Sequence, residues 1–356
     1  MLAACGHSSQ REREIVIDST PVSIAVDAMG GDNAPEAILM GVARALDADK
    51  GLTVLLTGDH SIVEPFAAQH TGRVTAIATT EIVEMGEHPA TAVRSKKDSS
   101  IVVGTRLVKD GHAGAVFSAG STGAAMAAAT LIMGRIKGVQ RPAIATALPT
   151  MGLPVVLLDV GANADCRPES LVQFAHMGAA YAATVLGRLN PSVALLNIGE
   201  EPTKGSQLAI EAHQLMIEQV PSFVGNIEGR AILDGEVDVI VTDGFTGNVA
   251  LKLLEGSSRV LLGQVRAAMT SSAWRKLLAA GLKPSLSKLK DRLDPDTYGG
   301  APLLGVNGVC IIGHGSSGAL AVENALKVAA QAARGDLTGQ IAQAVTGGSG
   351  AADPRP

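Results

Sequence analysis

The segment VSIAVDAMGGD, residues 22–32, decides how the chain folds. Its first part is apolar on both faces and ends at Asp27, and short runs of this kind are typical of buried parallel strands. Gly30 and Gly31 then allow a sharp turn, and residues 35–46 have the pattern of a helix. A strand, a glycine turn and a helix in this order predict an α/β unit.

The same pattern recurs along the chain. Short apolar runs end at a small or polar residue before a glycine, and longer helical patterns alternate with them. This alternation predicts a large α/β/α sandwich. No internal repeat and no clean linker divides the chain, so we expect a single catalytic domain over residues 21–342. The further expected strands are residues 53–58, 115–118, 154–159, 193–197 and 237–243.

The composition limits the classes of function. The 356 residues are 46% hydrophobic but only 2% aromatic, so a large core must be built from Ala, Val, Leu and Ile. A formal charge of −5 gives no globally basic surface for nucleic acid. Three scattered cysteines indicate a reducing compartment, and no apolar run is long enough to span a membrane. We therefore expect a cytoplasmic protein with polar tails at residues 1–20 and 343–356.

Small and acidic residues stand where the expected strands end. In open α/β sheets, ligands bind beyond the carboxyl ends of the strands. We therefore expect one cleft in which these residues converge, namely Asp27, Ser118, Asp159, Asn197 and Asp243.

Two glycine-rich loops are candidate phosphate sites. Gly30 and Gly31 allow backbone N–H groups to approach an anion closely. The second loop, residues 118–123, opens a helix whose N–H groups and neighbouring hydroxyls suit phosphate. Each loop also has a purely structural interpretation, as a tight turn in the first case and as a helix N-cap at Ser121 or Thr122 in the second.

Three further side chains are candidates for the chemistry itself. Lys204, in a loop after a buried strand, can supply a point charge to phosphate, or it can be a solvated lysine beside two glutamates. Asn248 offers an amide donor to an oxyanion, or it caps a helix that begins at Val249. His314 precedes Gly-Ser-Ser, but without a Gly-x-Ser-x-Gly elbow a structural role is equally open. No acidic residues have the spacing of a three-ligand metal site, so we expect no catalytic metal.

A set of motifs occurs in one order along residues 22–335. They are VDAMGGD (26–32), PATAVR (89–94) with KKDSS (96–100), DVGAN (159–163), NIGEE (197–201), GNIEGR (225–230), DGFTGN (243–248) and YGGAPLLG (298–305). Together they resemble the bacterial phosphate acyltransferase family, the PlsX-type acyl-ACP:phosphate acyltransferases. One such motif would be weak, but the whole set in this order is highly specific.

The resemblance implies an activity and a set of partners. The reaction is the transfer of a long-chain fatty acyl group from acyl carrier protein to inorganic phosphate, and the acyl phosphate feeds phospholipid synthesis through a glycerol-3-phosphate acyltransferase. The family fold is similar to isocitrate and isopropylmalate dehydrogenases and to phosphate acetyltransferases. The resemblance further implies a homodimer that needs neither cofactor nor metal.

The resemblance also raises the expectations for individual residues. Lys204 would hold phosphate, Asn248 would donate to the thioester carbonyl, and His314 would protonate the leaving thiolate. This sequence has Asn33, Ser121 and Ser206 where the family often has other polar residues, so the roles of these side chains are open. The expected phosphate- or substrate-binding residues are Asp27, Gly30, Gly31, Asp32, Ser118, Gly120, Ser121, Thr122, Gly123, Asp159, Asn163 and Asp243.

A helical pattern over residues 255–298 departs from the rest of the chain because it is basic and amphipathic. Residues 275–292 contain six basic side chains and one acid. The segment can lie on an anionic membrane surface, dock the acidic carrier protein, or form a dimer-interface or core helix with a solvated basic face. Its candidate contact residues are Trp274, Lys276, Leu278, Leu282 and Lys283.

Three rival functions remain open. A phosphate acetyltransferase that uses coenzyme A would share the sheet and the phosphate loops, but it would not explain the basic segment. A decarboxylating dehydrogenase would need clustered metal ligands and a nicotinamide site. A non-catalytic scaffold for lipid synthesis would have no need of phosphate loops.

Overall fold

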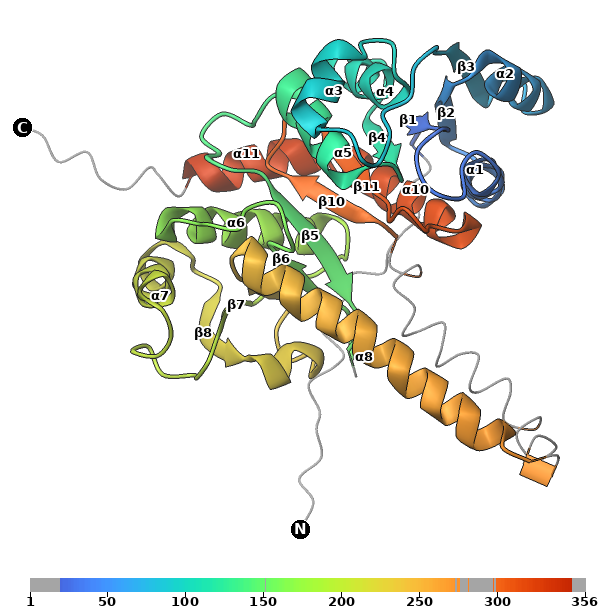
Figure 1. Ribbon diagram of the computed structural model, residues 1–356. Coiled ribbons are helices and arrows are strands. Elements are labelled where there is room, and N and C mark those ends of the chain that lie inside the picture. The colour runs from blue at the N-terminus through green and yellow to red at the C-terminus, as the bar shows by residue number, and fades with distance from the viewer. Residues whose placement is uncertain are drawn as a thin grey trace, which may run out of the picture.

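The structure is a computed structural model, and it describes residues 20–150, 152–272, 274, 275, 281, 297 and 299–347. The described strands form one 11-stranded sheet in the order β3-β2-β1-β4-β11-β10-β5-β6-β9-β7-β8 (Figure 1). The strands are β1 (Val22–Asp27), β2 (Leu52–Gly58), β3 (Val74–Ala78), β4 (Ala115–Ser118), β5 (Ala143–Leu148), β6 (Val155–Leu158), β7 (Val193–Asn197), β8 (Phe223–Glu228), β9 (Val239–Val241), β10 (Ala301–Leu304) and β11 (Val309–Ile312).

Antiparallel pairings in the middle of the sheet reverse the strand direction. β1, β2, β3, β4 and β11 are parallel to one another, and so are β6, β9, β7 and β8. Between these groups, β11 pairs antiparallel with β10, β10 with β5, and β5 with β6. Because this number of reversals is odd, the two parallel groups run in opposite directions. Their carboxyl ends therefore lie at opposite edges of the sheet, which we call the β1–β4 edge and the β6–β9 edge.

Helices cover both faces of the sheet (Figure 1). Side chains of a strand point alternately to the two faces, so Ile24 and Val26 belong to one buried cluster and Ala25 to the other. The first cluster lies under α1 (Glu36–Ala48), α2 (His60–Gln69), α6 (Pro168–Thr184), α7 (Gln207–Gln219), α10 (Ala319–Arg334) and α11 (Leu337–Gly347). The second lies under α3 (Pro89–Ser95), α4 (Ser100–Lys109), α5 (Thr122–Ala128) with the π-helical turn Ala129–Met133, and α8 (Gly244–Thr270). The predicted α/β/α sandwich is confirmed.

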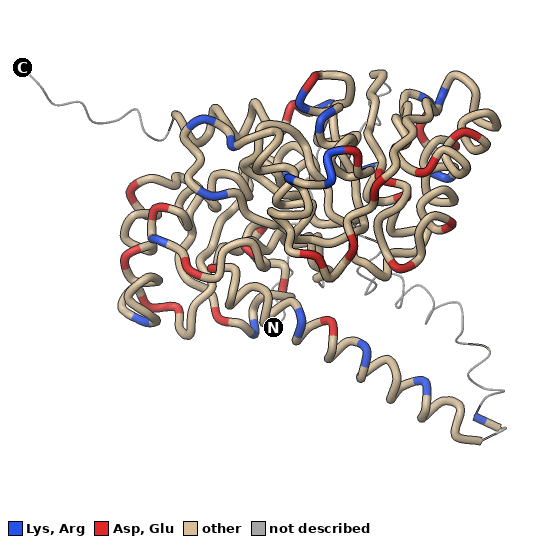
Figure 2. Tube along the Cα trace, turned by 45° about the horizontal axis from the view of Figure 1, so that its top comes forward, with Lys and Arg blue, Asp and Glu red and all other residues tan. Residues whose placement is uncertain are grey.

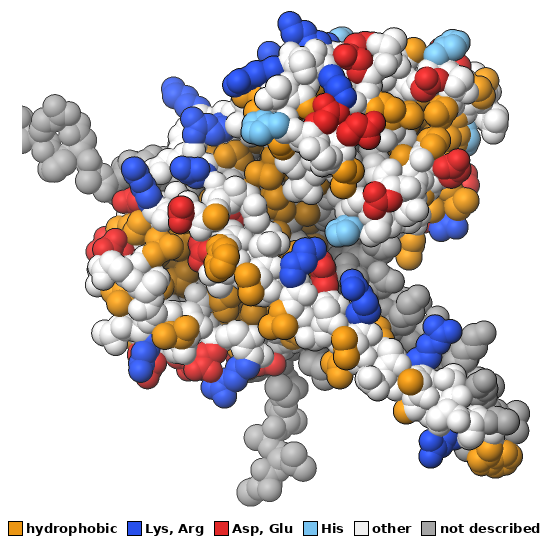
Figure 3. Space-filling view, in the orientation of Figure 1, with side chains coloured by type: hydrophobic (Ala, Val, Ile, Leu, Met, Phe, Trp, Pro, Cys, Tyr) orange, Lys and Arg blue, Asp and Glu red, His pale blue; other side chains and the backbone are white. Residues whose placement is uncertain are grey.

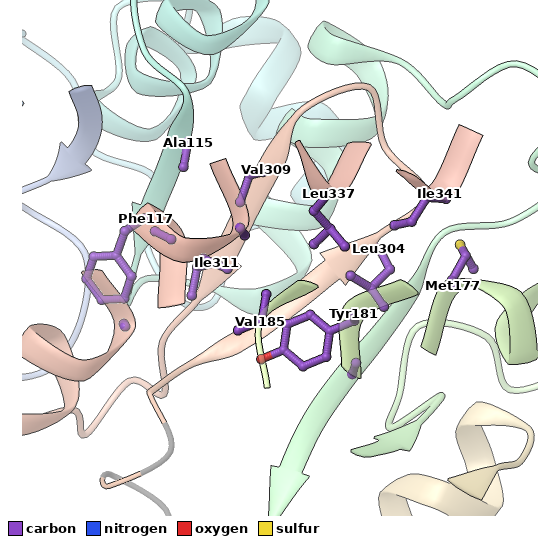
Figure 4. Packing of buried hydrophobic residues seen from close by; sticks show 14 of the residues in the cluster. Ala115, Phe117, Met177, Tyr181, Val185, Leu304, Val309, Ile311, Leu337 and Ile341 are labelled. Carbon is purple, nitrogen blue, oxygen red and sulfur yellow. The ribbon is translucent and has the colours of Figure 1, made fainter. Parts of the chain in front are cut away.

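One part of the core joins the two parallel groups of strands. Figure 4 shows Phe117 of β4 and Ile311 of β11 in the same packed layer as Leu304 of β10 and Tyr181 of α6. All four are at most 2% exposed. Burying a large apolar side chain contributes about 1.5–3 kcal/mol, so this layer holds the oppositely directed halves together as one platform.

Helix α8 begins at the sheet and extends beyond it. Ala250, Leu251 and Leu254 pack on the second core, whereas the later turns project away from the body (Figure 1). Among the described residues, no helix is both long enough and apolar enough to cross a membrane. The predicted protruding helix is present as far as Thr270, and it starts at Gly244 rather than at residue 255. Most of its predicted continuation to residue 298 lies outside the described residues.

Each strand expected from the sequence is present, with ends shifted by at most a few residues. Five further strands, β3, β5, β8, β10 and β11, were not predicted from the sequence, and β5 and β10 are the strands that reverse the direction. The expected C-terminal tail begins too early, because α11 continues past residue 343 to Gly347. Residues 1–19 and 348–356, where tails were predicted, lie outside the described residues. So do the candidate contact residues Lys276, Leu278, Leu282 and Lys283, whereas Trp274 is described and exposed.

Candidate active site

Asp159 organises the loop that follows β6. Its side chain is fully buried. Oδ1 accepts hydrogen bonds from the backbone N–H groups of Ile144, Gly161 and Ala162 at 3.0–3.2 Å, and Oδ2 accepts from the backbone N–H and side-chain amide of Asn163 at 2.7 and 2.9 Å. Burial raises the pKa of Asp159, and these donors partly oppose that rise. Asp159 thus shapes the loop, and its oxygens are engaged within the protein rather than directed at a substrate.

The start of α8 is fitted closely against this loop. Asp243 is the N-cap, and its Oδ1 accepts from the backbone N–H of Thr246 at 2.8 Å. The N–H of Gly244 donates to the carbonyl of Asn163 at 2.8 Å. A Cβ on Gly247 would lie 2.0 Å from the carbonyl oxygen of Asp159, so only glycine permits this approach. The loop and the first turns of the helix therefore form one rigid unit.

Asn248 lies on that unit. It is exposed within the first turns of α8, and a Cβ on Gly161 would lie 3.8 Å from its side chain. Because Asp243 caps the helix, the alternative that Asn248 caps a helix starting at Val249 is wrong. An exposed amide on a fixed helical turn is suited to donate a hydrogen bond to a carbonyl oxygen.

Lys204 lies at the same edge of the sheet, in the loop between β7 and α7. Its backbone N–H donates to the carbonyl of Glu201 at 3.1 Å, and its carbonyl accepts from the side-chain amide of Asn197 at 2.9 Å. Gly205 has φ +96°, and a Cβ there would come within 2.1 Å of Asn197 Oδ1. Ser206 follows as the N-cap of α7. The backbone of Lys204 is thus held on both sides while its side chain is exposed.

Cys166 lies beside the Asp159 loop. It is half-buried, and its thiol donates to the carbonyl of Asn163 at 3.6 Å. Burial raises the pKa of this thiol to about 11. A thiol with this pKa is protonated at neutral pH, which favours a packed role over a reactive one.

Asp27 ends β1 at the β1–β4 edge, in a position like that of Asp159 after β6. It is buried, and its carboxylate accepts from the Ser118 hydroxyl at 2.7 Å and from the backbone N–H of Met29 at 3.0 Å. Burial raises the pKa of Asp27 despite these donors. A Cβ on Gly30 would lie 2.7 Å from both Asp27 Oδ2 and the backbone nitrogen of Gly120. Gly30 is therefore required for the two loops to pack together.

Polar groups of the second glycine-rich loop form hydrogen bonds within the protein. The Gly120 N–H donates to the Ser118 hydroxyl at 3.1 Å, and the Ser121 hydroxyl accepts from the Ala124 N–H as the N-cap of α5. The structural interpretation of Ser121 is thus confirmed. Thr122 is exposed and Gly123 is half-buried at the first turn of α5.

His314 joins this group from the end of β11. Its Nδ1 lies 2.8 Å from the Ser316 hydroxyl and accepts from the Ser316 backbone N–H at 3.3 Å. The Asp32 N–H donates to the Gly315 carbonyl at 2.7 Å. The side-chain amide of Asn33 donates to the Ser316 carbonyl at 3.1 Å. These bonds fasten the first glycine loop to the turn after β11.

The predicted residues therefore form two groups rather than one. Lys204, Asn248, Asp159, Asn163, Asn197 and Asp243 lie at the β6–β9 edge, and the other predicted site residues lie at the β1–β4 edge. The expectation that all strand ends converge on one cleft in a single chain is wrong, because the antiparallel pairings reverse the second group. The predicted site residues at the β1–β4 edge are Asp27, Gly30, Gly31, Asp32, Ser118, Gly120, Ser121, Thr122, Gly123 and His314.

Sequence reasoning missed two side chains that support the Lys204 loop, His213 and Asn226. Both are buried, and they hydrogen-bond to each other across α7 and β8. Asn226 lies inside the GNIEGR motif, so the motif was the available signal, but no sequence feature connects it to residue 204. No cluster of His, Cys, Asp and Glu among the described residues has the geometry of a metal site.

The chain resembles known proteins over most of its length. Residues 22–339 match the model of a family described as fatty acid synthesis protein. The chain is 50% identical to a phosphate acyltransferase of Heliobacterium modesticaldum over 328 residues, covering 91% of this chain and 98% of that protein. It is 52% identical to a phosphate acyltransferase of Desulfitobacterium hafniense over 309 residues, covering 86% of this chain and 92% of the relative.

Solved structures with the same fold are much more distant in sequence. A phosphotransacetylase from Streptococcus pyogenes aligns with a TM-score of 0.60 at 17% identity, covering 88% of this chain and 94% of that one. The EutD phosphotransacetylase from Staphylococcus aureus aligns with a TM-score of 0.57 at 19% identity, covering 88% and 94% of the two chains. These likenesses concern the fold alone.

The fold and the relatives first define the class of protein, an acyltransferase whose reaction involves phosphate. More particularly, the chain belongs to the phosphate acyltransferase family of fatty acid and phospholipid synthesis.

Proposed function

We propose that this enzyme transfers a long-chain fatty acyl group from an acyl-carrier-protein thioester to inorganic phosphate, at the β6–β9 edge. The observation that carries the proposal is the arrangement of Lys204 and Asn248. Both side chains are exposed at the same sheet edge, on backbone that hydrogen bonds and close glycine contacts hold in place. Donors fixed before the substrate arrives stabilise developing charge with little reorganisation.

The proposed reaction is balanced, and Lys204 and Asn248 are the side chains that assist it. A phosphate oxygen attacks the thioester carbonyl carbon, and the tetrahedral intermediate that forms carries an oxyanion. The Lys204 ammonium holds the phosphate, and the Asn248 amide donates to the oxyanion. The carbon–sulfur bond then breaks, and the proton of hydrogen phosphate ends on the departing thiol. No atom changes its oxidation state, so the reaction needs no redox cofactor.

The β1–β4 edge takes no part in the proposed acyl transfer. Its glycine loops and His314 belong to one network of loop contacts, and the strand directions place them away from Asn248. We therefore assign the acyl transfer to Lys204 and Asn248 and leave His314 out of the catalytic step. Asn163 and Asp243 contribute by holding the loop and the helix on which Asn248 stands.

A homodimer would cover the helix that carries Asn248. Phe245, Val249 and Leu253 recur at helical spacing on α8 and are 52–67% exposed, and Figure 3 shows apolar side chains along this helix. We propose that a second copy of the chain packs on this stripe. Sedimentation should show a dimer for the wild type and monomers for Leu253→Lys. A wild-type monomer at micromolar concentration would reject this part of the proposal.

The projecting turns of α8 would serve delivery of the product. They carry Arg259 and Arg266, and Glu255 is the one acid in the sequence of α8. Figure 2 shows basic positions recurring along this helix. Val260 and Leu261 are more than 60% exposed there, and Trp274 beyond the helix is 66% exposed. We propose peripheral contact with the anionic inner face of the cell membrane, where a glycerol-3-phosphate acyltransferase takes up the acyl phosphate. Leu261→Asp with Trp274→Ser should lower co-sedimentation with anionic vesicles, and unchanged binding would contradict the membrane contact.

Trapping of the product tests the proposed reaction. The purified enzyme, incubated with palmitoyl-acyl carrier protein and phosphate, should yield acyl hydroxamate when hydroxylamine is added. Omission of phosphate should abolish the signal, and Lys204→Ala should lower it strongly in a protein with an unchanged unfolding midpoint. Product formation from acetyl-coenzyme A instead of the carrier-protein thioester would indicate a phosphate acetyltransferase.

A further inference from the structure

Two buried polar side chains behind the Lys204 loop have no part in the chemistry described so far. His213 of α7 is 4% exposed, and Asn226 of β8 is 7% exposed. The His213 Nδ1 lies 2.8 Å from Asn226 Oδ1. The Asn226 Nδ2 donates to the backbone carbonyl of Glu201 at 3.1 Å. A continuous chain of hydrogen bonds thus runs from the helix, through the strand, to the loop.

The Glu201 carbonyl determines which group donates and which accepts in each of these hydrogen bonds. The Glu201 carbonyl can only accept, so the amide nitrogen of Asn226 must face it and the amide oxygen must face His213. His213 Nδ1 therefore carries a hydrogen. The ring of Phe223 packs edge-on against the imidazole, with centroids 5.2 Å apart and planes at 78°. These contacts determine the orientation of the His213 ring and the hydrogen on Nδ1.

The Glu201 carbonyl is the point at which this chain of bonds meets Lys204. The same oxygen accepts the backbone N–H of Lys204 at 3.1 Å. On the other side of the residue, the Asn197 amide donates to the Lys204 carbonyl at 2.9 Å. The backbone of Lys204 is therefore held at both ends, and Asn226 supports one of them from inside the protein.

We infer that His213 and Asn226 are positioning residues that hold the Glu201–Lys204 turn in the geometry needed for phosphate. This inference rests on the role proposed above for Lys204. A buried amide is costly to place in an apolar layer unless it is hydrogen-bonded, and here both ends of the Asn226 amide have a partner. A misplacement of about 1 Å at a catalytic group lowers rates by about 100-fold, so small movements of this turn matter.

The variant Asn226→Asp removes the donor and places a carboxylate beside His213. The aspartate keeps the shape and still accepts from His213, but it presents an oxygen to the Glu201 carbonyl where the amide donated. We expect amide hydrogen exchange over residues 198–205 to accelerate about tenfold, and kcat/KM for phosphate to fall by about 10- to 100-fold. His213→Leu should act in the same direction, and His213→Gln, which can still donate to Asn226 Oδ1, should recover part of the loss.

Met216→Ala is the matched control. Met216 lies on the same helix and is fully buried, but it has no part in the hydrogen bonds to the loop. It should lower the unfolding midpoint while leaving exchange over residues 198–205 near the wild-type rate. Accelerated exchange of that loop in Met216→Ala equal to that in Asn226→Asp would assign the effect to general loosening and would overturn the inference.

A double-mutant cycle separates this inference from the proposed function. In a Lys204→Ala background, Asn226→Asp should have little further effect on kcat/KM for phosphate, because its effect acts through Lys204. A full and additive further loss would overturn the inference while leaving the role of Lys204 intact. Normal activity of Lys204→Ala alone would instead reject the proposed function, and the exchange of residues 198–205 in Asn226→Asp would still decide whether Asn226 holds the turn.

Discussion

The two carboxyl edges of the sheet follow the same plan but differ in what they expose. At each edge a buried carboxylate, Asp27 or Asp159, gathers donors from the following loop, and a glycine lets a second segment approach closely. At the β1–β4 edge the Gly120 N–H donates within its own loop and the Asn33 amide donates to the turn after β11, while Thr122 and His314 are exposed. At the β6–β9 edge the side chains of Lys204 and Asn248 remain exposed on the surface of the fixed backbone.

This difference separates loop architecture from chemistry. A pattern of strand, acid and glycine indicates a rigid loop at a strand end, because the acid satisfies backbone N–H groups and the glycine removes a steric obstacle. The pattern does not indicate which edge meets a substrate. That depends on which polar side chains the surrounding loops leave without a protein partner.

The largest effect should come from the exposed amide at the β6–β9 edge. Asn248→Ala should lower the rate of acyl phosphate formation by about 10²–10³, because it removes the donor to the oxyanion. Hydroxylamine trapping under saturating substrates measures this rate. Asn307→Ala, at an exposed turn between β10 and β11, is the matched control and should retain normal turnover. Near-normal turnover of a folded Asn248→Ala would remove the functional difference between the two edges.

The next largest effect should come from Asp159, the buried carboxylate of the loop beside Asn248. Asp159→Asn should lower the free energy of unfolding by about 3 kcal/mol, because one amide NH₂ group would face buried donors that now bind an oxygen. Urea unfolding followed by circular dichroism measures the change. If the variant were as stable as the wild type, the hydrogen bonds to Asp159 could not be what shapes the loop.

A close glycine contact should have a smaller effect. Gly247→Ala should destabilise the protein by about 1–3 kcal/mol, because its Cβ would meet the Asp159 carbonyl oxygen at 2.0 Å. Gly256→Ala on the same helix meets no atom within 4 Å and should stabilise the protein by about 0.5–1 kcal/mol. Thermal unfolding of both variants checks the pair, and equal midpoints would show that α8 does not depend on its contact with the Asp159 loop.

The smallest effect should appear as a pH dependence at the β1–β4 edge. Burial raises the pKa of Asp27 above its usual 3.8, so on acidification the folded protein takes up this proton before the unfolded chain does. Relative to Asp27→Asn, the wild type should therefore gain stability as the pH falls through the raised pKa, by at most about 1.4 kcal/mol per pH unit. Unfolding midpoints of both proteins between pH 4 and 8 measure the difference. Parallel curves would mean that the Asp27 carboxyl is not perturbed.

The local structure of the chain could be predicted from its sequence to a large extent. Apolar runs ending in a small or polar residue predicted six strands that are present, including Val22–Asp27, Ala115–Ser118 and Val193–Asn197 with their observed ends. The class of fold followed from their alternation with helices. The ordered motifs indicated the family and singled out Lys204 and Asn248.

The arrangement of these parts in space could not be predicted in the same way. β5 and β10 pair antiparallel with their neighbours, and this pairing separates Asp27 from Asp159 and His314 from Asn248. Strand direction within a sheet depends on contacts between residues far apart in sequence, which a local apolar pattern does not record. Likewise, only the packing of α7 on β8 brings His213 and Asn226 behind the Lys204 loop.

The sequence by itself therefore determined the elements, the fold class, the family and the two side chains proposed for the chemistry, because these depend on local patterns and on ordered motifs. The tertiary structure alone decided that the glycine loops and the Lys204–Asn248 group lie at opposite edges, and which buried groups support each of them. The physical reason is that hydrogen bonding and packing between distant segments set the strand directions and complete the hydrogen bonds of each loop.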